Sequence, residues 1–248
     1  MNGHALLEAR AVTVRFGGLV AVDAVSAAFA AGELVGIIGP NGAGKTTFFN
    51  ALSGVQAVSA GDLYAHGKRL TGSAPHTYAA QGIARTFQTP RVFAELTVTA
   101  NIDFGLQFAG RGRAASWLLK DTTSILNLIG LSAQAALPAA AITPSQQRLL
   151  EIGMALATRP KLLLLDEVAA GLTESEIDAM AQLIRRLRDE LDLTVIWIEH
   201  AVTTLLRYVE RVIVLHQGRK IADGTPAEVI RNAEVIEAYL GDEMVEAA

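Results

Sequence analysis

The stretch "ELVGIIGPNGAGKTT" (residues 33–47) decides the fold. Its first half is a short apolar run that ends in glycine, which predicts a buried strand. Its second half matches the pattern G-x-x-x-x-G-K-[ST], and "KTTFFNALSG" (residues 45–54) then predicts a helix that Gly54 closes. A strand, a glycine-rich turn and a helix in this order predict a phosphate-binding loop.

Each residue type in this loop suits phosphate chemistry. Glycines let the backbone curl so that several N–H groups point at one phosphate. Lys45 supplies positive charge to the β- and γ-phosphates of a nucleotide, and Thr46 offers a hydroxyl to Mg²⁺. We therefore expect the nucleotide-binding residues to be Gly39, Pro40, Asn41, Gly42, Ala43, Gly44, Lys45, Thr46 and Thr47.

Two carboxylates follow four leucines in "KLLLLDE" (residues 161–167). The leucines predict a fully buried parallel strand. Ligands of open α/β sheets bind outside the carboxyl ends of the strands, where the phosphate loop also lies. We expect Asp166 to hold Mg²⁺ and Glu167 to polarise the water that attacks the terminal phosphate.

The remaining segments predict a mainly parallel sheet with helices on both faces. In "AVTVRF" (residues 11–16), Val12, Val14 and Phe16 alternate as the buried face of a strand. Residues 61–70 predict a hairpin, residues 90–141 a helical insertion, residues 174–191 an amphipathic helix, and residues 193–200 and 211–218 two more strands.

In "AITPSQQRLL" (residues 141–150), Thr143 as N-cap, Pro144 at N1 and Gln146 at N3 predict a helix that begins with a capping box. The free N–H groups and the dipole of a helix start also suit an anion. This helix start could therefore cap itself, face a phosphate, or do both.

The composition limits the function. The chain has 248 residues, of which 51% are hydrophobic and 19% charged, and a net charge of −4 argues against a nucleic-acid-binding surface. The chain has no cysteine, which excludes disulfides and thiolate metal sites. We expect no signal peptide in "MNGHALLEARAVTV" and no membrane-spanning stretch, so any membrane role would be peripheral.

Taken together, these motifs resemble the nucleotide-binding subunits of ABC transporters over essentially all residues. The resemblance implies an α/β P-loop NTPase (RecA-like) fold, with a mainly parallel core, an N-terminal antiparallel β subdomain and a helical insertion subdomain. It implies one ABC ATPase domain over residues 1–248. Its parts would be a nucleotide-binding core (1–89 and 151–224), a helical subdomain (90–150) and a C-terminal helical tail (225–248).

The resemblance also implies roles for three further residues. Gln88 in "ARTFQTPRVF" (residues 84–93) holds the Q-loop position, which binds nucleotide and links Mg²⁺ to the insertion. His200 is similar to the switch histidine that contacts the γ-phosphate and assists Glu167 in catalysis. Phe16 in "VRFGG" corresponds to the aromatic residue that stacks on adenine, and "AAGL" (residues 169–172) to the D-loop, which communicates across the dimer.

The family signature L-S-G-G-Q aligns with Ile142–Gln146, which we call the signature segment. Thr143 and Gln146 are similar to the family pattern, both glycines are replaced, and Thr143, Ser145 and Gln146 would face the nucleotide of the second subunit. Pro144 lacks an N–H and Ser145 adds a Cβ. We therefore hypothesise an asymmetric pair, in which this chain's own site is complete while the site that its signature covers turns over poorly.

The most similar branch of the family is the ATPase subunits of branched-chain amino-acid importers, on "RFGGLVAVDAVS" (residues 15–26) and "GTPAEVIRNAEVIEAYLGDE" (residues 224–243). This resemblance implies ATP and Mg²⁺ as cofactors and a cytoplasmic location on the inner face of the membrane. The implied partners are a second ABC ATPase subunit, in a homo- or heterodimer, and integral membrane permease subunits, with no nucleic acid.

Three other functions stay open at this point. A lipid or lipopolysaccharide exporter uses the same motifs. A soluble regulatory or translation-linked ABC protein generally carries two such domains in one chain. A non-hydrolysing nucleotide-binding module would not need Glu167 and His200.

Overall fold

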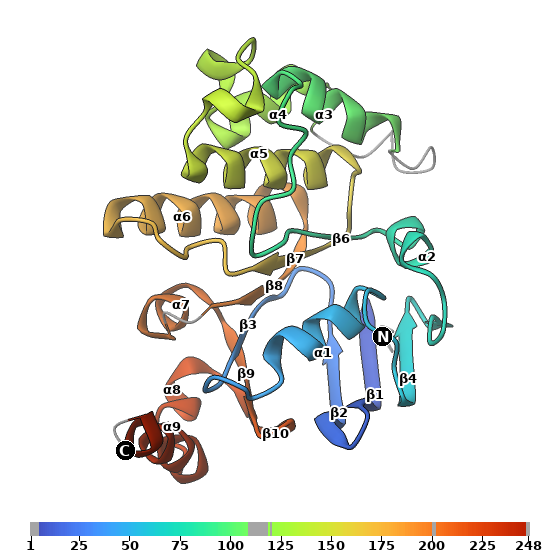
Figure 1. The fold of residues 1–248 in the computed structure, drawn as a ribbon, viewed down its shortest axis with the longest axis vertical. Coiled ribbons are helices and arrows are strands. Elements are labelled where there is room, and N and C mark those ends of the chain that lie inside the picture. The colour runs from blue at the N-terminus through green and yellow to red at the C-terminus, as the bar shows by residue number, and fades with distance from the viewer. Residues whose placement is uncertain (1–4, 109–118, 120, 200–201, 247–248) are drawn as a thin grey trace.

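Two β-sheets enclose helix α1, and a group of helices caps one end of the larger sheet (Figure 1). The structure is a computed structural model that describes residues 5–108, 119, 121–199 and 202–246, with side chains up to residue 239. The described strands are β1 (Leu7–Phe16), β2 (Leu19–Phe29), β3 (Leu34–Ile38), β4 (Ala60–Ala65), β5 (Lys68–Arg69), β6 (Ile83–Arg85), β7 (Leu162–Asp166), β8 (Thr194–Ile198), β9 (Arg211–His216) and β10 (Arg219–Gly224).

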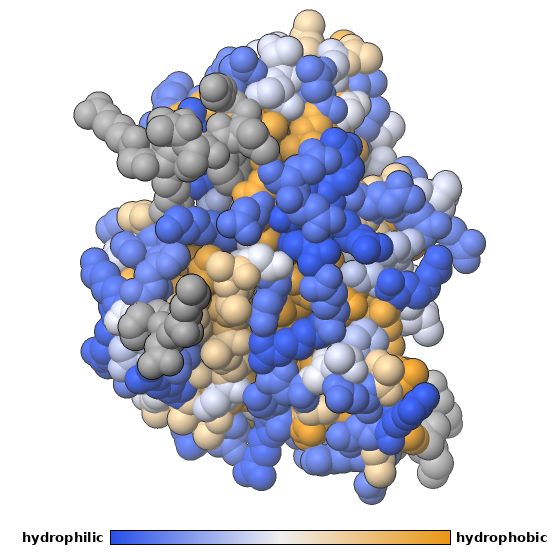
Figure 2. All heavy atoms as spheres, turned by 180° about the vertical axis from the view of Figure 1, so that it is seen from behind, coloured by the Kyte–Doolittle hydropathy of each residue, from blue (hydrophilic) through white to orange (hydrophobic). Residues whose placement is uncertain are grey.

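The helices cover both faces of the larger sheet (Figure 1). They are α1 (Lys45–Leu52), α2 (Pro75–Ala80), α3 (Val98–Gln107), α4 (Thr122–Ile129), α5 (Pro144–Ala157), α6 (Glu174–Leu191), α7 (Val202–Tyr208), α8 (Pro226–Val229) and α9 (Ala233–Glu246), with 3₁₀ turns η2 (Ser132–Gln134) and η3 (Ala139–Ala141). Among these described helices, none is long and apolar enough to cross a membrane. On the face of the molecule that Figure 2 shows, hydrophilic residues prevail and hydrophobic residues lie between them.

The larger sheet has the order β10-β9-β3-β8-β7-β6, and only β10 runs antiparallel to its neighbour. The expected mainly parallel sheet is therefore confirmed. The four leucines of β7 alternate between two cores, since Leu163 and Leu165 pack with the helices above the sheet while Leu162 and Leu164 pack with α1. Burial on both faces is why the first four residues of this strand are all apolar.

The second sheet is antiparallel, with the order β2-β1-β4-β5. It includes the hairpin expected in residues 61–70. Helix α1 lies between this sheet and the larger one, where Phe48, Phe49 and Leu52 are fully buried. The phosphate loop between β3 and α1 is thereby held between two sheets.

Helices α3, α4 and α5 with the turns η2 and η3 form a separate layer above the larger sheet (Figure 1), which we call the helical unit. Its helices pack closely: a Cβ added at Gly105 of α3 would lie only 2.7 Å from the carbonyl oxygen of Met154 in α5, so only glycine fits there. We expected the helical subdomain to end at residue 150 and the core to resume at residue 151. This position lies inside α5, which packs on α3 and α4 as far as Ala157.

The strand order brings together the ends of three segments that are far apart in the sequence. Strand β3 lies beside β8, and β8 beside β7, all parallel. Their carboxyl ends therefore meet at one edge, where the phosphate loop, the Asp166–Glu167 pair and Glu199 follow the strands.

Candidate nucleotide-binding site

The phosphate loop adopts backbone conformations that only glycine takes without strain. Gly39 has φ +153° and Gly44 has φ +93°. A Cβ at Gly39 would lie 2.0 Å from the carbonyl oxygen of Leu215, and one at Gly44 would lie 2.3 Å from that of Ala21. The loop is thus packed against β9 and β2 from behind, which fixes its curvature.

Lys45, the first residue of α1, folds its side chain back over this loop. Its Nζ donates hydrogen bonds to the carbonyl oxygens of Gly39 at 2.6 Å and Pro40 at 2.9 Å. The side chain is buried, and this burial lowers its pKa, an effect that the charge of Glu167 opposes. A buried cation at the start of a helix is suited to holding an anion.

A cavity of about 550 Å³ opens beside the loop. It is lined by Phe16, Leu19, Val20, Ala21, Asn41, Gly42, Ala43, Gly44, Lys45, Thr46, Thr47, Gln217 and Gly218. Its size falls in the range of small-molecule and cofactor sites. Seven of the nine loop residues that the sequence predicts line this cavity.

Phe16 corrects one expectation from the sequence. We predicted it on the buried face of its strand, but the residue is 49% exposed. It is the last residue of β1, at the turn into β2, where it pairs with Leu19 and lines the cavity, whereas Val12 and Val14 lie inside the core. An exposed ring at this position is free to stack on a flat ligand. The sequence analysis did not identify Leu19 and Gln217, because neither belongs to a motif.

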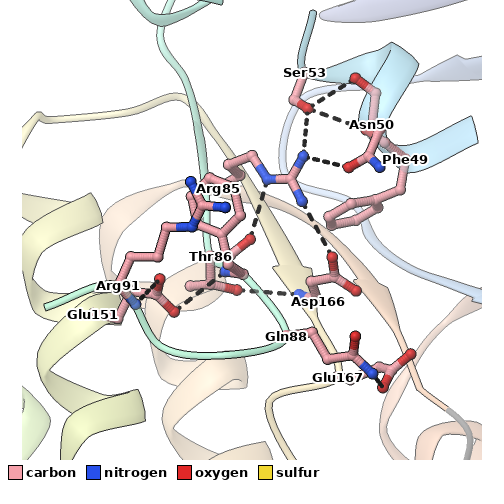
Figure 3. A network of polar contacts seen from close by, with 11 residues as sticks. Phe49, Asn50, Ser53, Arg85, Thr86, Gln88, Arg91, Glu151, Asp166 and Glu167 are labelled. Carbon is pink, nitrogen blue, oxygen red and sulfur yellow. Dashed lines mark hydrogen bonds and ion pairs between the residues drawn. The ribbon is translucent and has the colours of Figure 1, made fainter. Parts of the chain in front are cut away.

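Glu167 is held in a strained conformation at the end of β7. It has φ +50°, which costs on the order of 1–3 kcal/mol for a residue other than glycine. Its N–H donates to the Ile198 carbonyl oxygen at 2.9 Å, and its buried carboxylate accepts a hydrogen bond from Nε2 of Gln88 at 2.7 Å (Figure 3). The structure thus brings together two residues that are 79 positions apart.

Asp166 forms a buried ion pair that the sequence analysis missed. Nη2 of Arg85 lies 3.1 Å from its Oδ2, and Nη1 of Arg85 donates to Asn50 and Ser53 at 2.7 and 2.9 Å (Figure 3). Burial lowers the pKa of Arg85, and the charge of Asp166 opposes this. The only feature of the sequence that could have indicated this ion pair is the single arginine at the end of the apolar segment "GIAR" (residues 82–85).

Glu151 of α5 is a second buried charge that was missed. It is 5% exposed, and burial raises its pKa to about 7. Its Oε2 accepts the N–H of Phe87 at 3.3 Å and its Oε1 that of Arg91 at 2.9 Å (Figure 3), and these bonds and the charges of Arg85 and Arg91 oppose the shift.

Glu199 links the D-loop to the end of β8. Its Oε1 accepts hydrogen bonds from the N–H of Ala169 at 2.7 Å and from the indole N–H of Trp197 at 3.0 Å. Burial raises its pKa, and the nearby charge of Glu167 adds to the effect. The next residue, His200, which we expected in catalysis, lies outside the described residues.

The signature segment caps its own helix, as the sequence predicts. Oγ1 of Thr143 accepts the N–H of Gln146 at 3.2 Å, and Oε1 of Gln146 accepts the N–H of Thr143 at 3.0 Å. Pro144 has no N–H, so within this described first turn only the Ser145 N–H is left without a partner. The helix start therefore offers few backbone donors to an anion.

A carboxylate lies next to this helix start. Glu176 of α6 accepts hydrogen bonds from the N–H and the hydroxyl of Thr173, at 2.9 and 2.8 Å, and it lines the same hollow as Ser145. The contacts with Thr173, and to a smaller extent the Ser145 hydroxyl, lower the pKa of Glu176. The charge of Glu176 makes the signature segment less favourable for a phosphate.

The fold and the phosphate loop define this protein as a nucleotide-binding ATPase, and comparisons with known proteins identify its class. Residues 22–170 match the family described as ABC transporter, and the chain belongs to this family as one of its ATP-binding proteins. Residues 219–245 match a second family, described as branched-chain amino acid ATP-binding cassette transporter.

Individual relatives are similar over nearly the whole chain. The chain is 37% identical to the high-affinity branched-chain amino acid transport ATP-binding protein BraF of Pseudomonas aeruginosa, covering 96% of this chain and 98% of BraF. It is 38% identical to LivG of Escherichia coli, with the same coverage. A solved ATP-binding cassette of an ABC transporter, in its ADP conformation, shares 30% identity with a TM-score of 0.84, covering 96% and 99% of the two chains.

The raised pKa of Glu151 predicts a pH-dependent stability. The folded chain keeps the Glu151 proton up to a pH of about 7, while the unfolded chain loses it near 4.5, so stability falls as the pH rises between these values. We expect the free energy of unfolding of wild type, relative to Glu151→Gln, to fall by about 2 kcal/mol between pH 5 and pH 8. Urea denaturation measures both proteins, and a pH-independent difference would contradict the raised pKa.

Proposed function

We propose that this chain hydrolyses ATP to power a membrane importer of branched-chain amino acids or similar small amide or amino-acid solutes. The observation that carries this proposal is the cavity beside the phosphate loop, next to the Lys45 ammonium and near the Glu167 carboxylate. The names of BraF and LivG, similar over nearly the whole chain, support the choice of solute. Lipopolysaccharide export has no such support.

Different residues of the chain have different proposed roles in hydrolysis. The N–H groups of the phosphate loop, which Pro40 lacks, and the ammonium of Lys45 hold the β- and γ-phosphates, and Phe16 stacks on adenine. Glu167 orients the water whose oxygen attacks the γ-phosphorus and accepts the proton that this water loses, and Gln88 holds the Glu167 carboxylate. The bond from the γ-phosphorus to the bridging oxygen breaks, which gives ADP and inorganic phosphate. By the family resemblance, His200 contacts the γ-phosphate.

The donor set at this site fits Mg²⁺. The hydroxyl of Thr46, the side-chain amide of Gln88 and the carboxylate of Asp166 supply the oxygen ligands that Mg²⁺ prefers. The described residues contain no group of three His, Cys, Asp or Glu side chains that could hold a metal alone, as is usual where phosphates complete the coordination. When bound, the ion neutralises charge on the phosphates.

By the family resemblance, a second subunit completes the site, so a second ATP-binding subunit is part of the proposal. Thr143, Ser145 and Gln146 would approach the nucleotide of that subunit. The capping box occupies the N–H groups of Thr143 and Gln146, and Glu176 lines the same hollow as Ser145. We therefore propose that the site covered by this signature segment is the slower one of the pair.

The permease subunits are proposed to dock on an aromatic cluster at α3, formed by Phe104 of α3, Phe108 at its end and Phe93 before it, which would place the chain on the cytoplasmic face of the membrane. The rings of Phe93 and Phe104 are 4.7 Å apart and those of Phe104 and Phe108 are 5.2 Å apart, and all three side chains are exposed. Adjacent exposed aromatic rings are typical of interaction surfaces.

ATP turnover tests the catalytic proposal and the signature together. We expect the purified chain at high concentration to hydrolyse ATP slowly but above the Glu167→Gln variant, which lacks the catalytic carboxylate. We expect the double variant Pro144→Gly with Ser145→Gly to be about tenfold faster, because it restores a backbone donor and removes the Ser145 side chain. Equal rates with and without the glycines would contradict the asymmetric pair, and no turnover in either protein would contradict the catalytic proposal.

Membrane association tests the docking surface. We expect Phe104→Ser with Phe108→Ser to weaken binding to membrane vesicles that contain the permease subunits by about tenfold, since buried aromatic residues dominate interfaces. Val55→Ser, which removes an exposed apolar side chain outside the cluster, is the matched control and should bind as wild type does. Sedimentation with the vesicles measures the bound fraction, and equal binding of both variants would exclude the aromatic cluster.

A further inference from the structure

One carboxylate holds the backbone on both sides of Gln88. The two oxygens of Glu151 accept the N–H groups of Phe87 and Arg91, at 3.3 and 2.9 Å, and these residues bracket Gln88 (Figure 3). The Phe87 ring is itself enclosed by guanidinium groups, with Arg85 at 4.4 Å and Arg91 at 4.0 Å from its centroid. We call residues 87–91 the Q-loop and the two carboxylate contacts the Glu151 clamp.

The residues just before the Q-loop are attached to the core instead. The N–H of Thr86 donates to the carbonyl oxygen of Leu164 at 2.9 Å, and the Thr86 hydroxyl accepts the N–H of Asp166 at 3.1 Å. Arg85 adds its ion pair with Asp166 (Figure 3). The backbone is therefore bonded to the β-sheet core up to Thr86 and to helix α5 from Phe87 onward.

The residues after the Q-loop are attached to the helical unit as well. Oδ1 of the buried Asn101 in α3 accepts the N–H of Phe93 at 2.8 Å, and its Nδ2 donates to the carbonyl oxygen of the same residue at 3.1 Å. Helix α5 packs tightly on α4, as the lack of space at Gly153 shows: a Cβ added to this residue of α5 would lie 2.7 Å from Cδ1 of Ile129 in α4. From Phe87 to Phe93 the chain is thus bonded to the body that contains α3, α4 and α5.

We infer that Glu151 is a positioning residue that makes Gln88 follow the signature helix α5 rather than the β-sheet. The clamp fixes the backbone of Gln88 to α5, and the Gln88 side chain reaches the catalytic carboxylate of Glu167 on the core at 2.7 Å. Any rotation of the helical unit against the sheet then changes the Gln88–Glu167 contact, while the Arg85–Asp166 pair stays unchanged. This inference rests on the proposed roles of Gln88 and Glu167 in hydrolysis.

Amide hydrogen exchange by NMR tests the clamp without any need for turnover. At pH 8, above the pKa of Glu151, Glu151→Gln keeps the shape of the side chain but removes its charge and one acceptor oxygen. We expect the amide hydrogens of Phe87 and Arg91 to exchange about tenfold faster in this variant, as expected for the loss of charge-assisted hydrogen bonds. The amides of Thr86 and Phe93, whose partners are Leu164 and Asn101, should keep their rates.

The exchange pattern separates the clamp from a general loosening of the fold. Faster exchange at Thr86 and Phe93 as well, or unchanged exchange at Phe87 and Arg91, would overturn the inference. Glu190→Gln is the matched control, because Glu190 is an exposed glutamate of α6 that pairs with Arg186. It should leave all four amides unchanged.

A double-mutant cycle tests whether Glu151 acts through Gln88. If it does, Glu151→Gln slows ATP turnover about tenfold in wild type but has no further effect in the Gln88→Ala background. Equal slowing in both backgrounds would assign Glu151 a structural role only and overturn the inference. If wild type itself shows no turnover above Glu167→Gln, the catalytic proposal fails, while the exchange experiment still decides whether the clamp exists.

Discussion

The structure depends on how Glu167 is fixed at the end of β7. This residue takes a left-handed conformation, which is strained for a residue with a side chain, and contacts from three elements hold it there. Its N–H bonds to the end of β8, its carboxylate to Gln88, and its carbonyl oxygen accepts Nη1 of Arg148 in α5 at 2.8 Å. Sheet, Q-loop and signature helix therefore all meet at one residue.

The contacts of Glu167 show that the proposed site combines residues of the β-sheet core with residues of the helical unit. The sheet positions the phosphate loop and Asp166 by parallel strand pairing, so their relative geometry is built into the core. Gln88 and Arg148 reach the same carboxylate-bearing residue from the helical side. With the proposed roles of Gln88 and Glu167, the position of the helical unit would affect hydrolysis without any movement of the phosphate loop. A membrane partner docked on that unit, as proposed, would act through the same contacts.

Local patterns in the sequence predicted the strands around the phosphate loop, the buried β7 and the capping box at residues 143–146. Each rests on residues within one turn or one strand. The Arg85–Asp166 pair and the Glu151 clamp could not be predicted in this way, because their partners are 81 and more than 50 positions apart. Phe16 was misjudged because alternation along a strand cannot tell that its last residue, at the turn into the next strand, is exposed.

The central claim is that the cavity beside Lys45 binds the nucleotide, and the thermal stability of the chain in Mg-ATP tests it most directly. At a ligand concentration 100-fold above the dissociation constant, binding adds about 2.7 kcal/mol, which raises Tm by about 5 °C or more in a chain of this size. The account predicts this shift for wild type and for Lys68→Ala, an exposed lysine of β5, and its loss in Lys45→Ala. An equal shift in all three proteins, or none in wild type, would contradict the account.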